Sequence, residues 1–478
     1  MSNKSFKLLI VEDEKEISHA IECVFKRYIS DIEITIVSCR DEAFSILEDA
    51  DNFFDYITLD LNIPSTEHSY EKTSKNGMAV LGKCVSHAKG TPVLVITGTS
   101  TADMISEFLR SSEKVDVWGN KKEKPSIDHL RKEDLDKLSQ IVDEVKSDFE
   151  GIFHVELSTD GFTIPVEHDR LLRIFSKKKN GAIAKIKPIG GGLSEAKVYS
   201  LDLYDCNDHL IFRAIAKCGP NHKIKRDAEN YDEYISRLEP SATPRKIELL
   251  TFGAASYSAV FYGLAAGYNH SFFKACEEGI MNDSLNESVK GLLHPWHHLS
   301  TKKMLKIQDV RRFLLSDDDA RHVINEFGLV EANNFETKVI PCSLSMQHGD
   351  LHGENILIDV EKKISTLIDY GDVLEMVGII DSITLECSFL FHPNAKKYAW
   401  PSDEQLEKWF FIDDYVDGCP VENSIRFCRG WTDLLKRGNR EVSACLYSYA
   451  LRQLKYNSTN KNTALRLIHV AYRIYDAS

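Results

Sequence analysis

QHGDLHGENILI, residues 347–358, is followed nine residues later by LIDYGD, residues 367–372. Phosphoryl transfer from ATP needs a carboxylate that orients the attacking hydroxyl, and it needs an amide and a second carboxylate that hold Mg²⁺. Asp350, Asn355 and Asp369 supply these groups in that order. The five-residue separation of Asp350 and Asn355 is also that of the protein-kinase catalytic loop. The stretch therefore predicts the catalytic and metal-binding loops of a phosphotransferase.

The other groups that such a site requires lie upstream. The strand-like segment 211–216 leads to Lys217, and Glu229 in the helical segment 226–238 is placed to pair with it. Glycines at a hairpin tip let the backbone approach phosphates, although a plain hairpin turn uses the same residues. Such a tip holds three glycines, Gly190, Gly191 and Gly192. The glycines, the lysine and the two loops that carry Asp350 and Asp369 thus follow one another along the chain in the order found in kinases.

The motif HGDLHxxN followed by IDYGD resembles the aminoglycoside phosphotransferase and choline kinase group of the protein-kinase-like fold. The resemblance covers about residues 183–478. It implies an α+β domain with two lobes that binds ATP and Mg²⁺. It also implies the following roles: Asp350 as catalytic base, Lys217 on the α- and β-phosphates, Glu229 as the partner of Lys217, and Asn355 and Asp369 as Mg²⁺ ligands.

The hydroxyl acceptor has no readable motif. Asp381 fits the aspartate of the family that braces the catalytic loop. The acidic stretch 403–417 is suited to attracting a cationic acceptor such as an aminosugar or choline, but a solvated helix face is the more common reason for such a run. The resemblance therefore predicts a reaction and leaves its acceptor undefined.

The first 150 residues carry a different pattern. Short apolar runs alternate with helical segments, which predicts a doubly wound parallel sheet of five strands. The predicted strands are residues 8–11, 34–37, 56–59, 92–96 and 115–118. Residues beyond the carboxyl ends of parallel strands converge on one crevice. The residues expected there are Glu12, Asp13, Asp60, Thr97 and Lys121.

Three carboxylates in one crevice are suited to Mg²⁺, and one of them can act as a nucleophile on phosphorus. LLIVEDE, LDLNIP and VLVIT resemble the receiver domain of two-component response regulators over residues 5–148. The resemblance implies that Glu12 and Asp13 hold Mg²⁺ with Asp60, that Asp60 accepts phosphate from a histidine kinase or phosphotransfer protein, and that Thr97 and Lys121 respond to it.

Two features depart from the receiver pattern. The segment between Pro64 and Gly77 is longer than the usual tight turn. The lysine is also ambiguous, because Lys124 precedes a proline as in the family. Lys121 is preferred because it lies three residues beyond Trp118, which is the family's spacing.

We expect an amphipathic helix over residues 131–149 to close the receiver. The predicted domains are a receiver (1–150), a linker with extra N-lobe elements (151–182), a kinase-like N-lobe (183–264) and a C-lobe with the catalytic loop (265–478). The predicted fold is thus an α/β receiver followed by an α+β kinase-like domain.

The chain has 478 residues, of which 43% are hydrophobic and 28% are charged, and its net charge is −14. This acidic balance argues against nucleic acid as a partner. The eleven cysteines include no C-x-x-C pair, which is typical of reduced cytoplasmic thiols. The apolar run at the N-terminus has only four residues, and no long apolar stretch follows, which predicts a cytoplasmic protein without a membrane anchor.

These observations favour a response regulator whose output is an ATP-dependent phosphotransferase controlled by Asp60. A homodimer is compatible with this organisation. The alternatives are a nucleotide-binding adaptor without catalysis and a protein kinase, because fold alone does not define the acceptor.

Overall fold

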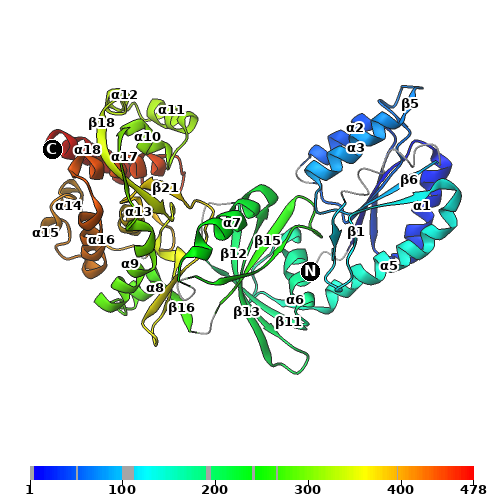
Figure 1. Cartoon of the computed structure of the whole chain (residues 1–478), viewed down its shortest axis with the longest axis horizontal. Helices are drawn as coiled ribbons and strands as arrows, with labels where there is room; N and C mark the ends of the chain where they lie inside the picture. Colours follow the sequence, from blue (N-terminus) through cyan, green and yellow to red (C-terminus); the bar gives the residue numbers. More distant parts are fainter. Residues whose placement is uncertain are drawn as a thin grey trace. The chain divides into compact units, whose positions relative to one another are not determined.

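A parallel sheet forms the first part of the chain (Figure 1). The structure is a computed structural model, and it describes residues 5–49, 52–98, 112–189, 195–239, 243–264, 267–395 and 397–478. The strand order of the first sheet is β2-β1-β3-β6-β9. Its members are β1 (Phe6–Val11), β2 (Ile32–Val37), β3 (Tyr56–Leu59), β6 (Val93–Thr97) and β9 (Ile127–Arg131). All four neighbouring pairs are parallel, which confirms the predicted fold class of this part.

Helices cover both faces of this sheet (Figure 1). One face packs against α1 (Lys15–Tyr28) and α5 (Leu138–Glu150), and the other against α2 (Arg40–Glu48) and α3 (Ser74–His87). Strand β1 shows why its sequence is apolar throughout. Phe6, Leu8 and Ile10 belong to one core, while Leu9 and Val11 belong to the other. Side chains alternate between the faces of a strand, so a central parallel strand buries every position.

The fifth strand is not where the sequence placed it. Val115 belongs to the short hairpin of β7 (Lys114–Val115) and β8 (Lys124–Pro125), and residues 116–118 lie between these two strands. Strand β9 takes the edge position of the sheet instead. Only Ile127 and Leu130 of β9 are buried, whereas its other residues are exposed. An edge strand with so few buried side chains has a weakly apolar sequence. The more apolar segment 115–118 therefore resembles a strand more closely than β9 does.

A six-stranded sheet follows, with the order β10-β11-β12-β13-β15-β14. Its strands are β10 (Glu156–Ser158), β11 (Ile183–Ile189), β12 (Lys197–Tyr204), β13 (Leu210–Pro220), β14 (Arg245–Leu250) and β15 (Tyr257–Gly263). Helix α6 (Val166–Lys178) contacts β13 and β15. Gly190, Gly191 and Gly192 lie outside the described residues, so the predicted glycine hairpin stays a prediction.

The two sheets share one compact unit. This unit comprises residues Met1–Pro188, Glu195–Lys225 and Lys246–Gly263. One hydrophobic core runs from Phe6 of β1 through Phe175 of α6 to Phe261 of β15. The predicted boundary near residue 150 therefore does not separate compact units.

The second unit comprises residues Ile189–Ser194, Arg226–Arg245 and Leu264–Ser478. It contains the sheets β16-β19-β20 and β17-β18-β21. Their strands are β16 (Tyr268–Ser271), β17 (Thr301–Lys306), β18 (Val339–Gln347), β19 (Ile356–Asp359), β20 (Ile364–Leu367) and β21 (Leu374–Val377). The helices are α8 (Phe272–Glu277), α9 (Asp283–His297), α10 (Ile307–Arg312), α11 (Asp317–Glu326), α12 (Val330–Phe335), α13 (Ile380–Phe391), α14 (Asp403–Glu407), α15 (Ile412–Tyr415), α16 (Glu422–Leu435), α17 (Asn439–Leu454) and α18 (Lys461–Asp476).

Helix α7 (Asn221–Glu233) begins in the first unit and ends in the second. Further short elements lie within the described residues: β4 (Ile63–Pro64), β5 (Lys72–Thr73), and the 3-10 turns η2 (Lys132–Lys137), η3 (Gly151–His154), η4 (Ile235–Arg237) and η5 (Gly353–Asn355).

Among the residues that the structure describes, no helix combines the length and the apolar character that crossing a membrane requires.

Candidate functional sites

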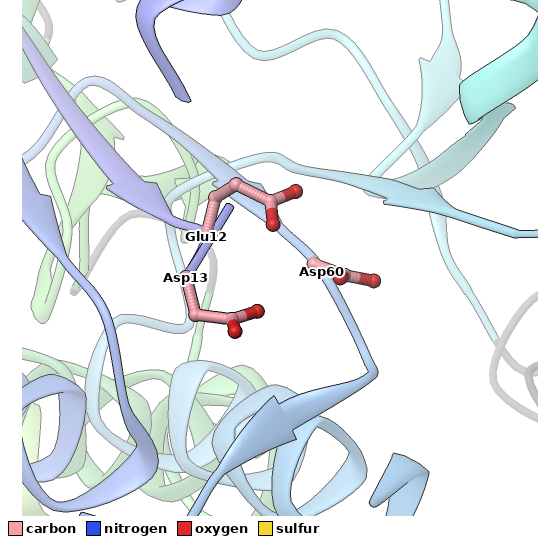
Figure 2. Close-up of side chains that lie close together, drawn as sticks. All are labelled: Glu12, Asp13 and Asp60. Carbon is pink, nitrogen blue, oxygen red and sulfur yellow. The ribbon is translucent and has the colours of Figure 1, made fainter. Parts of the chain in front are cut away.

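Three carboxylates meet at the carboxyl edge of the first sheet. Glu12 and Asp13 follow β1, and Asp60 follows β3. Each offers one oxygen, and these oxygens lie within 4.8 Å of one another (Figure 2). Glu12 and Asp60 are buried, and Asp13 is half-buried. The structure thus brings together the three residues predicted to form one acidic pocket.

The lysine of this pocket is Lys132, the first residue after β9. Its Nζ lies 2.8 Å from Oδ2 of Asp60 and 3.0 Å from Oε2 of Glu12. Lys121 instead donates to Asn180 at 2.7 Å. Lys124 pairs with the α5 carboxylates Glu144 at 3.0 Å and Asp148 at 3.1 Å. We therefore assign the pocket lysine to Lys132 in place of Lys121 or Lys124. The correction follows from the position of the fifth strand, because the residue after that strand reaches the pocket.

Thr97 ends β6 and is buried. Its register partner is Arg131, the residue before Lys132. Thr97 therefore lies at the same sheet edge as the pocket, as predicted from its place at the end of a strand.

The charges in the pocket act strongly on one another. Burial and the neighbouring charge of Asp60 raise the pKa of Glu12 to about 7. Burial lowers the pKa of Lys132, but hydrogen bonds to Asp60 and Glu12 outweigh it and raise the pKa above its usual range. Asp13 Oδ1 is buried and has no hydrogen-bond partner within the described residues. Clustered carboxylates with such an oxygen fit a hard cation such as Mg²⁺.

The second candidate site is the loop after β18, which carries Asp350. The Asp381 carboxylate accepts hydrogen bonds from the backbone N–H groups of His348 at 2.7 Å and Gly349 at 2.9 Å. Asn355 Nδ2 donates to the carbonyl of Asp350 at 2.9 Å. Gly349 has a φ of +81°, and a Cβ there would lie 2.4 Å from the carbonyl oxygen of Asp372. Asp381 thus braces the loop in the way that the family resemblance implies.

The loop after β20 carries Asp369, which has a φ of +68°. The buried Asp227 of α7 accepts a hydrogen bond from the backbone N–H of Tyr370 at 3.0 Å. Asn230 of α7 donates to the carbonyl of Tyr370 at 2.8 Å. These two residues hold the loop, and no sequence motif indicates this role. Glu229 of the same helix is exposed, and its pairing with Lys217 stays a prediction.

Arg452 of α17 contacts the expected catalytic base. Its Nη1 lies 3.3 Å from Oδ1 of Asp350, and its Nε donates to the hydroxyl of Tyr456 at 3.2 Å. Burial raises the pKa of Asp350, but the charges of Arg452 and His352 outweigh it and bring the pKa below its usual range. No motif indicated Arg452, because it follows Asp350 by 102 residues and lies in the last turn of α17, where a basic residue is ordinary.

Lys217 lies in β13, between Val198 of β12 and Val260 of β15. The residue is buried. It belongs to the first compact unit, whereas Asp350, Asn355 and Asp369 belong to the second.

The acidic stretch 403–417 is largely neutralised by basic side chains. Arg466 pairs with Asp403 at 2.7 Å and Glu407 at 3.0 Å. Arg426 pairs with Asp413 at 2.8 Å. This pairing favours the interpretation as an ordinary charged surface over the recruitment of a cationic acceptor.

No model of a known protein family matches the chain, and no curated protein matches it. Similar folds occur among solved structures. A phosphorylated response regulator of a cyanobacterial phytochrome, RcpA, is 24% identical and covers 30% of this chain and 94% of its own, with a TM-score of 0.23. A thermostable mutant of aminoglycoside phosphotransferase APH(4)-Ia, in complex with ADP and hygromycin B, is 9% identical over 61% of this chain and 94% of its own, with a TM-score of 0.32.

An ethanolamine kinase from Plasmodium vivax is 14% identical over 62% of this chain and 83% of its own, with a TM-score of 0.28.

Proposed function

We propose that the chain is a two-component response regulator whose output is an ATP-dependent phosphotransferase acting on a hydroxyl acceptor. The proposal joins the acidic pocket around Asp60 to the loop around Asp350. Phosphorylation of Asp60 controls the phosphotransferase. The phosphoryl donor is a histidine kinase or a phosphotransfer protein.

At the acidic pocket, an oxygen of Asp60 attacks the phosphorus of the donor, and the bond from phosphorus to the donor breaks. Mg²⁺, held by Glu12, Asp13 and Asp60, would offset the charge that grows on the phosphoryl oxygens. Lys132 already lies 2.8 Å from Asp60 and contributes a second positive charge. Thr97 contacts the phosphoryl group and transmits its arrival.

At the second site, Asp350 accepts the proton of the acceptor hydroxyl while the hydroxyl oxygen attacks the γ-phosphorus of ATP. The bond between the γ-phosphorus and the bridging oxygen breaks, and ADP leaves. Asn355 and Asp369 would hold Mg²⁺, which would offset the negative charge of the phosphates. Lys217, supported by Glu229, binds the α- and β-phosphates. The backbone at Gly190, Gly191 and Gly192 covers them.

One observation supports catalysis most strongly. Asp381 and Asn355 hold the backbone on both sides of Asp350, so the expected base lies on a fixed loop. Such preorganisation suits a group that has to meet a hydroxyl in one defined geometry. A nucleotide-binding adaptor has no need for a base held in this way.

Phosphorylation of Asp60 is tested with acetyl phosphate and Mg²⁺. Wild-type protein should become labelled, and Asp60→Asn should not, while both keep the same unfolding midpoint. Labelling that survives the substitution would place the phosphoryl group on another residue.

Phosphotransfer is tested with Mg²⁺ and γ-labelled ATP, with and without a cell extract that supplies acceptors. We expect Asp350→Asn to retain ATP binding and to lose at least a hundredfold in turnover, the usual scale for removal of a positioned base. Label on a small molecule supports the proposal, and label on protein indicates a protein kinase. Binding of ATP with no transfer in wild type identifies the adaptor.

A further inference from the structure

The extra residues between Pro64 and Gly77 form a short antiparallel hairpin beside the acidic pocket. Strands β4 and β5 pair Ile63 with Thr73 and Pro64 with Lys72. Thr73 then caps α3, because its hydroxyl accepts a hydrogen bond from the backbone N–H of Lys75 at 3.4 Å. Both the hairpin pairing and the start of the helix therefore hold the backbone of Lys72.

The hairpin places a cation on one of the expected metal ligands. Lys72 Nζ lies 2.6 Å from Oδ2 of Asp13. The Lys72 side chain is 40% exposed, whereas that of Asp13 is only 11% exposed. With Lys132 on Glu12 and Asp60, the three carboxylates of the pocket are all paired with lysines.

We propose that Lys72 is a built-in counter-ion that competes with Mg²⁺ for Asp13 and thereby sets the Mg²⁺ concentration at which the pocket fills. The proposal rests on the proposed function of the pocket as a metal site. It adds a role for a residue that lies outside the receiver motifs and is supplied by the inserted hairpin.

Electrostatics explains the competition. Mg²⁺ binds carboxylate oxygen at roughly 2.0–2.1 Å, so it would lie only a few ångströms from an ammonium group on the same carboxylate. The repulsion between such charges remains appreciable even at the dielectric constant of water. Lys72 therefore either leaves Asp13 when the metal binds or stays and weakens the metal's hold. Both outcomes lower the affinity for Mg²⁺.

A direct metal titration of the full-length protein tests this role. We expect Lys72→Met to bind Mg²⁺ roughly threefold to tenfold more tightly than wild type, measured by calorimetry without any phosphoryl donor. Lys75→Met is the matched control, because Lys75 is exposed, lies three residues away and makes no contact with the pocket carboxylates. Its affinity should equal that of wild type.

A double-mutant cycle with Asp13→Asn shows whether the effect runs through Asp13. On the Asp13→Asn background, the gain from Lys72→Met should fall to less than twofold. An unchanged or weaker affinity in Lys72→Met overturns the inference while leaving the metal site intact. If neither wild type nor Lys72→Met binds Mg²⁺ at millimolar concentration, the pocket is not a metal site and the proposed function of the receiver fails as well.

Discussion

Lys132 is the lysine that contributes most to the chemistry proposed for the acidic pocket, because it contacts both Glu12 and Asp60. We expect Lys132→Met to slow the labelling of Asp60 by acetyl phosphate by about tenfold or more, since a charge beside the transferred group is lost. Lys121→Met and Lys124→Met are matched controls and should label at the wild-type rate. A slow Lys121→Met variant would contradict the assignment.

The three lysines also show where the sequence was informative. The carboxylates could be predicted because each directly follows an apolar strand, such as β1 or β3, that is central in the sheet and buried on both faces. Lys132 follows an edge strand with two buried residues, so the local signal favoured the apolar segment ending at Trp118. Burial on both faces gives a strand its apolar signal, and an edge strand has only part of it.

Arg452 acts on the expected base through charge, and this predicts a pH effect. The Arg452 charge lowers the pKa of Asp350 against the effect of burial, so its removal should raise that pKa. The acidic limb of the pH profile for ATP turnover should therefore move to higher pH in Arg452→Met, because Asp350 must be ionised to accept a proton. Arg452→Lys keeps a positive charge, so its acidic limb should lie between that of wild type and that of Arg452→Met.

The control for this prediction is Arg466→Met, which removes an arginine of α18 that pairs with Asp403 and Glu407. Its pH profile should match that of wild type. A merely structural role for Arg452 predicts lower turnover at all pH values with no movement of the acidic limb.

At the scale of elements, α6 connects the two sheets of the first unit. Its residues are buried at His168 and continuously from Arg170 to Ser176. Phe175 stacks on Phe261 of β15 with ring centroids 3.8 Å apart, and Arg170 lies over the ring of Phe149 of α5 at 4.5 Å. Two charged arginines and a histidine interrupt the apolar face of this helix, so its sequence does not indicate that it is buried.

His168 of α6 gives this packing a pH dependence. Its ring shares a 2.8 Å hydrogen bond with the hydroxyl of Tyr199, and burial lowers its pKa from 6.5 to about 4. His168 therefore becomes protonated near pH 6.5 in the unfolded chain but only near pH 4 in the folded protein. The stability from this group is full above pH 6.5 and falls as the pH decreases.

We expect the contribution of His168 to the free energy of unfolding to decrease by roughly 1 kcal/mol between pH 7.5 and 5.5. His168→Gln should be less stable at pH 7.5 and should lose correspondingly less stability on acidification. Urea unfolding of both proteins at the two pH values measures the difference. Equal pH dependence in the two proteins would show that His168 titrates normally in the folded state.

At the scale of the whole molecule, local motifs predicted the parts and long-range contacts arranged them. Asp350 and Asn355 lie in one loop, and their relation could be predicted from spacing alone. Asp227, Asn230 and Arg452 reach the two loops from helices far along the chain, where an aspartate, an asparagine or an arginine is ordinary. The core that the two sheets share could likewise not be predicted from the sequence. An apolar face in a sequence indicates that the face is buried but not which element covers it.

That shared core offers a route by which phosphorylation of Asp60 would control the proposed phosphotransferase. Gly90, in the loop between α3 and β6, exchanges backbone hydrogen bonds of 2.8 Å with Ala255 and Gly253, in the loop between β14 and β15. Strand β15 pairs with β13, which carries Lys217. A rearrangement of the first sheet on phosphorylation therefore has a packed route to the strand of the predicted ATP lysine, in addition to the covalent route through α5.

Gly90→Ala tests this route, because a Cβ at residue 90 would lie 2.6 Å from the carbonyl oxygen of Ala255 and force the two loops apart. Beryllofluoride, which mimics the phosphoryl group on Asp60, should change the ATP affinity of wild type, and this change should shrink at least twofold in Gly90→Ala. Labelling of Asp60 should be unaffected. Gly82→Ala in α3 is the control, because its Cβ would meet no atom within 4 Å.

Measurements at several protein concentrations distinguish this intramolecular route from dimerisation, which alone makes the change concentration-dependent. Coupling through Gly90 requires a concentration-independent change that is lost in Gly90→Ala and kept in Gly82→Ala. If both variants respond as wild type does, the signal passes through α5 instead. If wild type itself shows no change with Asp60 occupied, the shared core is purely structural, and the receiver serves to select a partner.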